Sequence, residues 1–402
     1  MTAPPNRATS GSPTLPEVAR SGRRGLAPRL DVDGLVGDEA TRIVVTCGSG
    51  GVGKTTTAAA MAVRAAESGR RTVVLTIDPA RRLAQSMGLT ELDNTPRPVK
   101  GVDGDLFAMM LDMKRTFDDV VSAHSTPERA QQIFANPFYQ ALSSSFAGTQ
   151  EYMAMEKLSQ LAETGEWDLI VVDTPPSRSA LDFLDAPQRL GRFLDGRMIR
   201  LLVAPARAGG RASIKLVTVG LTVFSKVLSR ILGGDLLQDV SSFVAALETM
   251  FGGFRQRAEQ TYRLLKAPGT AFVVVAAPEP DALREASYFV ERLAQDAMPF
   301  AGLVVNRMHH AVPGLTARRA EAAADALAEK IGDSDSGELA LAEAVLRVHV
   351  ETALTADQDT RMARRFAAAH PDVATVTVPA LPADVHDLDG LRRISALLTT
   401  GA

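Results

Sequence analysis

An eight-residue glycine-rich segment constrains this 402-residue chain more than any other part of its sequence. Residues 48–55 read Gly-Ser-Gly-Gly-Val-Gly-Lys-Thr and match the pattern G-x-x-x-x-G-K-[ST] in full. An apolar, β-branched run at residues 43–46 precedes the segment, and a helix-forming run at residues 56–64 follows it. A loop of this sequence between a strand and a helix is typical of phosphate-binding proteins. The segment therefore predicts an α/β fold of the P-loop nucleotide hydrolase class.

The residue types of this loop each suit the binding of a nucleotide triphosphate. Glycines allow backbone N–H groups to close around phosphate oxygens, and the start of the next helix directs its positive dipole end at the anion. Lys54 is predicted to contact the β- and γ-phosphates, and the Thr55 hydroxyl to bind Mg²⁺. The predicted nucleotide contacts of the segment are Gly48, Ser49, Gly50, Gly51, Val52, Gly53, Lys54, Thr55 and Thr56.

Two aspartates follow apolar runs that read as strands. Asp173 comes directly after residues 169–172, and Asp78 directly after residues 72–77. The carboxyl ends of parallel strands meet at one edge of a sheet, so both carboxylates are expected beside the loop. Asp173 is predicted to bind Mg²⁺ through a water molecule, and Asp78 to orient or polarise the attacking water. Aspartates at strand ends also occur as ordinary turn and cap residues.

Six apolar runs predict strands of a parallel sheet covered by helices on both faces. They are residues 43–46, 72–77, 169–172, 272–275, 303–305 and 373–378. Residues 1–40, rich in Pro, Gly and Ser, are expected to be a disordered leader, and residues 41–402 the P-loop domain. Residues 112–165 and 185–265 carry helical patterning and predict an inserted helical subdomain. Its apolar surface is either buried or binds a partner.

Charge and cysteine content exclude several classes of protein. A formal net charge of −3 gives no overall basic field, so nucleic acid is not an expected partner. The single cysteine, Cys47, allows neither an internal disulfide nor a cysteine metal site, which fits a reducing cytoplasm. No uncharged apolar stretch reaches the length of about 18 residues that a spanning helix needs.

Three motifs together resemble the arsenite-pump ATPase family, which includes the ATPases that guide tail-anchored membrane proteins. They are the loop at residues 48–56 with its doubled glycine, Asp-Pro-Ala at 78–80, and Asp-Thr-Pro-Pro-Ser at 173–177. The resemblance covers the chain from about residue 42 onward. It is greatest to the actinobacterial branch of anion-transporting ATPases.

This resemblance implies a Mg²⁺-dependent ATPase that acts as a dimer with nucleotide at the subunit interface. Asp78 falls on the family's first switch, and Asp173 begins the second. Glu279 and Asn306 fall on nucleotide-contacting positions, and Pro379 on the loop beside the base. The absence of an Asn-Lys-x-Asp or Thr-Lys-x-Asp signature also favours ATP over GTP.

One position departs from the family in a way that affects function. Its loop usually carries a second lysine, which contacts the nucleotide of the opposite subunit, where this chain has Ser49. We therefore expect a heterodimer with a lysine-bearing paralogue in preference to a homodimer. Two hypotheses remain open. The chain is an ATPase that couples nucleotide state to a hydrophobic or membrane-associated client, peripheral to the membrane through a partner. Alternatively, it is a weakly hydrolysing, nucleotide-gated scaffold subunit.

Overall fold

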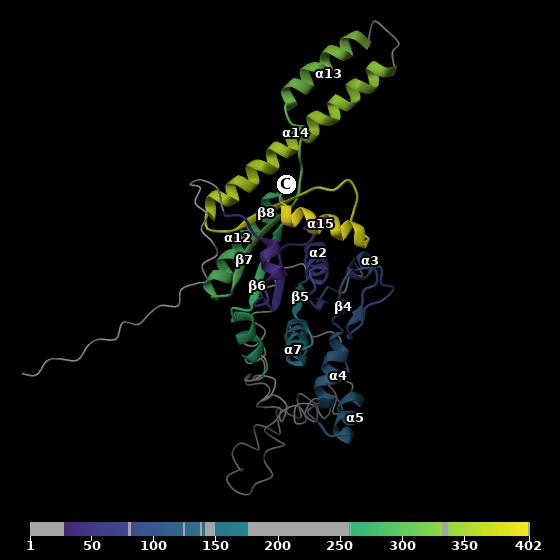
Figure 1. The fold of residues 1–402 in the computed structure, drawn as a ribbon, viewed down its shortest axis with the longest axis vertical. Helices are drawn as coiled ribbons and strands as arrows, with labels where there is room; N and C mark the ends of the chain where they lie inside the picture. The colour runs from purple at the N-terminus through teal and green to yellow at the C-terminus, as the bar shows by residue number, and fades with distance from the viewer. Residues whose placement is uncertain are drawn as a thin grey trace, which may run out of the picture.

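The computed structural model describes residues 28–78, 82–123, 125–136, 139–140, 149–175, 257, 259–331 and 337–400. Eight strands in this part form one sheet (Figure 1). They are β1 (Ile43–Cys47), β2 (Thr72–Thr76), β3 (Arg97–Pro98), β4 (Leu106–Met110), β5 (Leu169–Asp173), β6 (Thr270–Ala276), β7 (Phe300–Met308) and β8 (Thr375–Pro379).

The strand order is β3-β4-β2-β5-β1-β6-β7-β8, and every pair except β3–β4 is parallel. The predicted parallel α/β sheet is thus confirmed. Every residue of β1, β2, β5 and β6 is buried, which explains why these strands read as unbroken apolar runs. β3 and β4 were not among the predicted strands.

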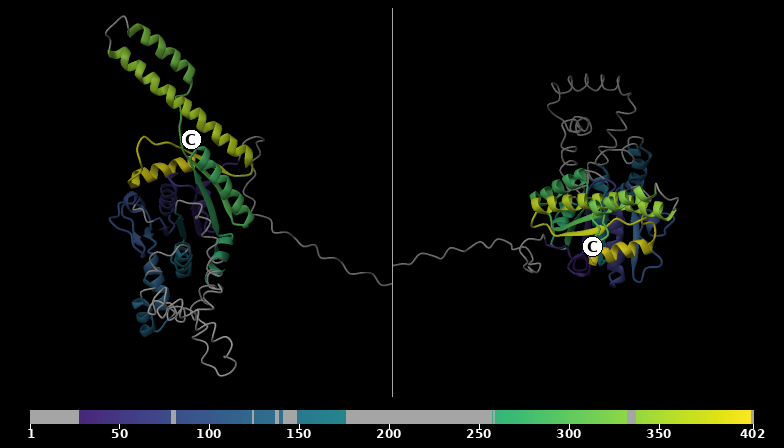
Figure 2. Two further views of the ribbon diagram at one scale, coloured as in Figure 1. Left: turned by 180° about the vertical axis from the view of Figure 1, so that it is seen from behind. Right: turned by 90° about the horizontal axis from the view of Figure 1, so that it is seen from above.

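Helices cover both faces of the sheet. They are α1 (Val32–Gly37), α2 (Lys54–Glu67), α3 (Arg82–Ser86), α4 (Met113–Ala123), α5 (Pro127–Ala135), α7 (Thr149–Thr164), α12 (Pro280–Gln295), α13 (Ala317–Ile331), α14 (Gly337–Ala369) and α15 (Leu388–Thr400). One hydrophobic cluster joins α1, α2, α3 and α15 to the sheet, and a second joins α4, α5, α7 and α12 to it. Figure 2 shows these layers from behind and from above.

The expected leader of residues 1–40 is too long at its C-terminal end. Residues 32–37 form α1, and Leu30, Val32 and Val36 are buried in the cluster that contains α2. The Asp31 carboxylate caps this helix by accepting a hydrogen bond of 2.9 Å from the backbone N–H of Gly34. Three apolar side chains among polar neighbours are enough to attach the segment, although its composition resembles that of a disordered tail. Residues 1–27 lie outside the described residues.

The described parts of the segment at residues 112–165 are mostly helical, as α4, α5 and α7 show. Its side chains share a hydrophobic cluster with β1, β2 and β5, so this part packs directly on the sheet. Of the second predicted segment, 185–265, only residue 257 and residues 259–265 belong to the described part, and they are helical. The inserted subdomain therefore stays a prediction. None of the described helices is both long and apolar enough to cross a membrane.

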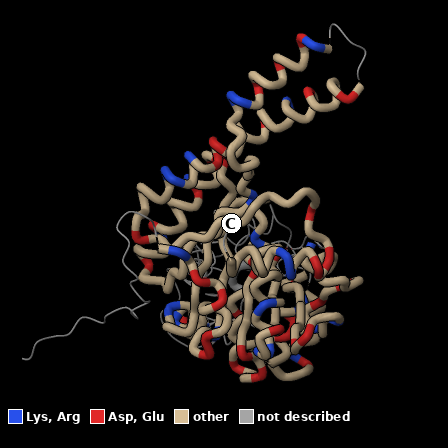
Figure 3. Tube along the Cα trace, turned by 45° about the horizontal axis from the view of Figure 1, so that its top comes forward, with Lys and Arg blue, Asp and Glu red and all other residues tan. Residues whose placement is uncertain are grey.

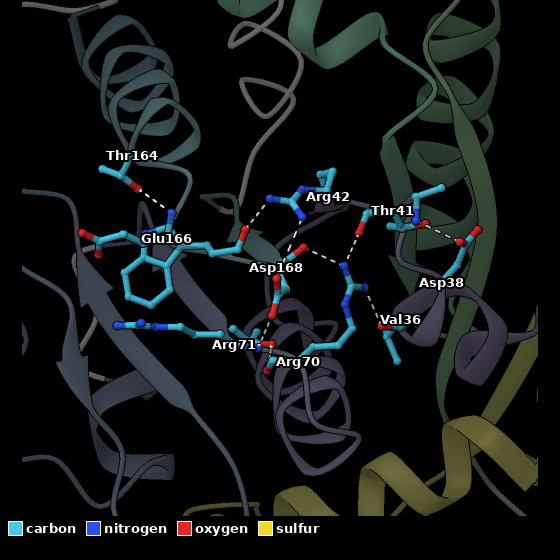
Figure 4. Close-up of polar contacts among 12 residues, drawn as sticks. Val36, Asp38, Thr41, Arg42, Arg70, Arg71, Thr164, Glu166 and Asp168 are labelled. Atoms are coloured by element: carbon cyan, nitrogen blue, oxygen red, sulfur yellow. Dashed lines mark hydrogen bonds and ion pairs between the residues drawn. The ribbon is translucent and has the colours of Figure 1, made fainter.

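A polar network ties together the amino ends of the three central strands (Figure 4). The buried guanidinium of Arg70, just before β2, donates to the carbonyls of Val36, Thr41 and Asp168 at 2.7, 2.6 and 2.6 Å. Arg42, just before β1, donates to the carbonyl of Trp167 at 2.7 Å. These contacts fix the amino ends of the strands, and the phosphate-binding loop lies at the opposite, carboxyl ends.

A helical hairpin formed by α13 and α14 extends away from the body of the molecule (Figures 1 and 2). Phe366, near the C-terminal end of α14, is buried against the sheet, with Met362 packed beside it. The protruding half of the same helix carries exposed Leu341 and Val345. Figure 3 shows acidic and basic residues interspersed along the hairpin and the body. The sequence did not lead us to predict this hairpin.

Candidate functional site

The phosphate-binding loop joins β1 to α2 in a conformation that requires glycine. Gly48, Gly51 and Gly53 have φ angles of 148°, 77° and 96°. A Cβ atom on Gly48 would lie 2.0 Å from the carbonyl oxygen of Val275, and one on Gly53 would lie 2.2 Å from Nδ2 of Asn306. The loop therefore passes directly against the end of β6 and the Asn306 amide. No residue with a side chain fits at these two positions.

Lys54, the first residue of α2, is held inside the loop. Its Nζ donates a hydrogen bond of 2.7 Å to the backbone carbonyl of Ser49, and the residue is only 5% exposed. Burial lowers the pKa of Lys54, and the nearby Asp173 carboxylate opposes that shift. An ammonium in this position gains from the arrival of a polyanion, because an opposite charge offsets its desolvation.

Asp173, the last residue of β5, is fully buried beside the loop. Its Oδ2 accepts hydrogen bonds from the hydroxyls of Thr55 at 2.8 Å and Thr76 at 2.9 Å. Its Oδ1 is buried without a hydrogen-bond partner among the described residues. Burial raises the pKa of Asp173 to about 6, while the two threonine hydroxyls and Lys54 oppose that rise.

The residues around Asp173 fit a divalent cation. Mg²⁺ prefers carboxylate, hydroxyl and water oxygens, and the orphaned carboxylate oxygen lies beside a threonine hydroxyl in a buried site. A cation there would place a positive charge next to the Asp173 oxygen that has no hydrogen-bond partner among the described residues. Thr55 and Asp173, the two predicted metal-binding residues, are thus in direct contact with each other.

Asp78 lies two residues beyond β2, at the same edge of the sheet, and is half-buried. Its backbone N–H donates to the Thr76 hydroxyl at 3.2 Å, and that hydroxyl in turn donates to Asp173. Thr76 therefore connects the two aspartates. We did not predict Thr76 from the sequence, although its place at the end of a strand that leads to Asp78 is a usable signal. Residues 79–81 lie outside the described part of the chain.

A cavity of about 560 Å³ adjoins the loop. Five of the predicted nucleotide contacts line it together: Gly53, Thr56, Glu279, Asn306 and Pro379. Three of these come from the ends of β6, β7 and β8, which the sequence separates widely. The Asn306 amide donates to the carbonyl of Val52 at 2.9 Å and so links the cavity to the loop.

Three further residues of the cavity wall were missed because they come from the hairpin. Thr355, Gln358 and Asp359 lie on one side of α14, at the spacing of a single helical turn. No motif marks them, and no strand end precedes them. Only the packing of α14 against β7 and α12 brings them to the site.

Two residues of the loop region carry no group suited to catalysis. The Ser49 hydroxyl oxygen is buried without a hydrogen-bond partner among the described residues, and a serine brings no charge. Cys47 is buried in β1, and burial raises the pKa of its thiol to about 12. It behaves as a small apolar core residue.

Comparison with known proteins gives consistent matches. A family model described as "Anion-transporting ATPase" matches residues 41–314. The chain is 26% identical over 282 residues to ATPase GET3A of Arabidopsis thaliana, which covers 70% of this chain and 71% of that protein. It is 25% identical over 291 residues to ATPase GET3 of Podospora anserina, covering 71% and 80%. It is 28% identical over 285 residues to ATPase ARSA2 of Chlamydomonas reinhardtii, covering 70% and 72%. The matched range ends just before α13.

Proposed function

This chain belongs to the anion-transporting ATPase family and is an ATPase, and from that premise we propose that residues 48–56 hold the triphosphate of ATP while Thr55 and Asp173 hold Mg²⁺. The observation that carries the proposal is the convergence of Lys54, Thr55 and Asp173 at one edge of the sheet. The Thr55 hydroxyl contacts the Asp173 carboxylate at 2.8 Å, and Lys54 lies buried within the loop. These groups have the chemistry of a phosphate and metal site.

The residues of the chain have separable tasks in hydrolysis. Backbone N–H groups of the loop and the Lys54 ammonium stabilise negative charge on the γ-phosphate as it is transferred. Asp78 orients the attacking water and accepts its proton. Thr76 holds the turn that carries Asp78 through the hydrogen bond from its backbone N–H. Bound Mg²⁺ supplies further positive charge at the phosphate oxygens.

The cavity beside the loop is the proposed site of the adenosine moiety. Asn306 and Glu279 bring an amide and a carboxylate into it, and Pro379 brings an apolar surface. The amide of Asn306 has a second N–H and a carbonyl oxygen for the donor–acceptor edge of adenine. The hydrogen bond from Asn306 to Val52 places this amide next to the phosphate-binding loop.

Substitution of Asp173 tests the metal site. Asp173→Asn removes the negative charge but keeps the size of the side chain, so the Mg²⁺ concentration needed for half-maximal ATPase activity should rise by about 10- to 100-fold. Titration of activity with Mg²⁺ at saturating ATP measures this. Asp103→Asn, an exposed aspartate in a turn, is the matched control and should behave as wild type. An unchanged Mg²⁺ requirement in Asp173→Asn would remove this residue from the metal site.

Substitution of Asp78 tests the proposed role in chemistry. Asp78→Asn keeps the backbone contact to Thr76 but removes the basic group, so kcat should fall by about 10²-fold. The affinity for ATP and Mg²⁺ should be retained, which equilibrium binding with a fluorescent ATP analogue measures. Asp103→Asn, the exposed aspartate used above, serves again as the control. Wild-type kcat in Asp78→Asn would identify Asp78 as a turn residue only.

The residue at position 49 bears on which partner subunit the chain needs. We propose that the chain functions in the cytoplasm as a dimer, preferably a heterodimer with a lysine-bearing paralogue and otherwise a homodimer. Ser49 offers no charge to a second nucleotide site. A weakly hydrolysing scaffold subunit is the second candidate function, and the same residue supports it. Binding of a hydrophobic or membrane-associated client, through residues 112–165 and 185–265, is the coupled activity that we propose for the ATPase.

A further inference from the structure

One buried carboxylate joins the helical hairpin to the nucleotide pocket. Asp359, on α14, is only 5% exposed. Its Oδ2 accepts a hydrogen bond of 2.8 Å from the backbone N–H of His309 and lies 2.8 Å from Nδ1 of the same residue. A carboxylate only accepts hydrogen bonds, so the tautomer with a proton on Nδ1 satisfies both contacts. We call this pair the His309–Asp359 contact.

The residues just before His309 form the irregular C-terminal end of β7, which contains Asn306. Arg307 has a φ angle of 61°, which is unusual for a residue with a side chain, and the pairing of β7 with β8 shifts between Val305 and Met308. A backbone conformation of this kind persists only where its surroundings hold it. The His309–Asp359 contact supplies two of the interactions that do so, within three residues of Asn306.

The same helix forms one wall of the cavity. Thr355, Gln358 and Asp359 of α14 line it together with residues at or near the C-terminal ends of β6, β7 and β8. The position of α14 therefore determines how closely the cavity encloses a ligand. The phosphate-binding loop is coupled to α14 less directly, because it contacts β6 and β5 and is linked to this region only through the Asn306 amide among the contacts described above.

We propose that Asp359 is a positioning residue for nucleotide binding: it holds α14 and the C-terminal end of β7, which contains Asn306, together, so that the hairpin encloses the adenosine end of the nucleotide. The inference rests on the proposed function of the cavity as the adenosine site. It assigns to the hairpin, which lies beyond the range matched by the family, a part in ATP affinity. Asp359 acts on the nucleotide through Asn306 and through the wall formed by α14.

The test compares two probes that occupy different parts of the site. A non-hydrolysable ATP analogue reports on the whole site, and inorganic tripolyphosphate reports on the phosphate-binding loop alone. Asp359→Ala removes both hydrogen bonds, so the Kd of the ATP analogue and the KM for ATP should rise about tenfold. The Kd of tripolyphosphate should rise far less than that of the ATP analogue, because the loop is linked to α14 only indirectly through Asn306, and kcat should stay at its wild-type value. Calorimetric titration and steady-state kinetics measure these quantities.

Asp357→Ala is the matched control, because Asp357 lies on the same helix two residues away, is exposed and does not line the cavity. If Asp359→Ala does not fold, Asp359→Asn and His309→Ala decide the question. His309→Ala keeps the backbone N–H but loses the ring contact, and Asp359→Asn keeps one acceptor, so each should weaken the ATP analogue about threefold. Thermal melting of each variant checks that it is folded.

Two results would overturn the proposal. One is wild-type affinity for the ATP analogue in the folded variants of Asp359 and His309. The other is an equal loss of affinity for the analogue and for tripolyphosphate, which would mean that the contact acts on the whole protein. Failure of the proposed function gives a different result, because Lys54→Ala would then leave binding of both probes unchanged.

Discussion

Lys54→Ala should abolish measurable ATP turnover and weaken ATP binding by about 10²-fold. The ammonium is the main side-chain counter-charge for the β- and γ-phosphates, and alanine leaves only backbone N–H groups in the loop. The structure adds a second expectation. Burial lowers the pKa of Lys54 in the nucleotide-free protein, so its charge is held there at a cost in stability.

Without nucleotide, Lys54→Ala should therefore melt close to the wild-type temperature, because relief of the desolvation cost is offset by loss of the attraction to buried Asp173, whereas the rise in Tm on adding ATP should be lost. Thermal melting with and without ATP measures both effects, and steady-state assays measure turnover. Lys100→Ala, an exposed lysine in a turn, is the control and should keep turnover and the ATP-dependent rise in Tm. Wild-type binding and turnover in Lys54→Ala would show that this loop is not the active site.

The second large effect is expected from a partner that supplies the charge missing at Ser49. The isolated chain should hydrolyse ATP slowly, and co-expression with a lysine-bearing paralogue should raise turnover at this chain's site by about 10³-fold, the size of effect that a cation supplied from another subunit has elsewhere. A serine hydroxyl has neither the charge nor the length to replace it. Lys54→Ala introduced into this chain alone shows which of the two sites carries the gain.

Ser49→Lys offers a simpler version of the same test. If the chain self-associates, the variant should gain activity that rises with protein concentration, because each added lysine acts on the opposite subunit. Ser49→Ala is the control and should match wild type, since the Ser49 hydroxyl has no hydrogen-bond partner among the described residues. Full turnover by the isolated wild-type chain, without gain from Ser49→Lys, would refute the heterodimer and leave an ordinary self-sufficient ATPase.

Much of the sheet could be predicted from the sequence because buried parallel strands leave a clear signal. β1, β2, β5 and β6 are buried on both faces and appear as unbroken runs of Val, Ile and Leu. β4 was missed because its sequence, Leu-Phe-Ala-Met-Met, has no β-branched residue and resembles a helix. Residues 30–36 were predicted to belong to a disordered leader, because three apolar side chains are too few to change the composition of a polar segment.

The residues of the candidate site also differ in how clearly the sequence marks them. Lys54, Asp78 and Asp173 lie in motifs or at the ends of clear strands, and the structure brings them to one edge of the sheet. Glu279, Asn306 and Pro379 were placed only by resemblance to a family, yet they line one cavity with Gly53 and Thr56. Asp359 could not be predicted, because its position depends on how a long helix packs against β7 and α12.

The length of α14 has a mechanical consequence. At 1.5 Å per residue, its 33 residues span about 50 Å, and Asp359 lies roughly 33 Å from the first residue, Gly337. A rotation of about 5° around Asp359 would displace that end by about 3 Å and the other end by less than half as much. A small rotation of this kind would thereby be amplified along the hairpin. The exposed apolar side chains Leu341 and Val345 sit on the arm that would move farthest.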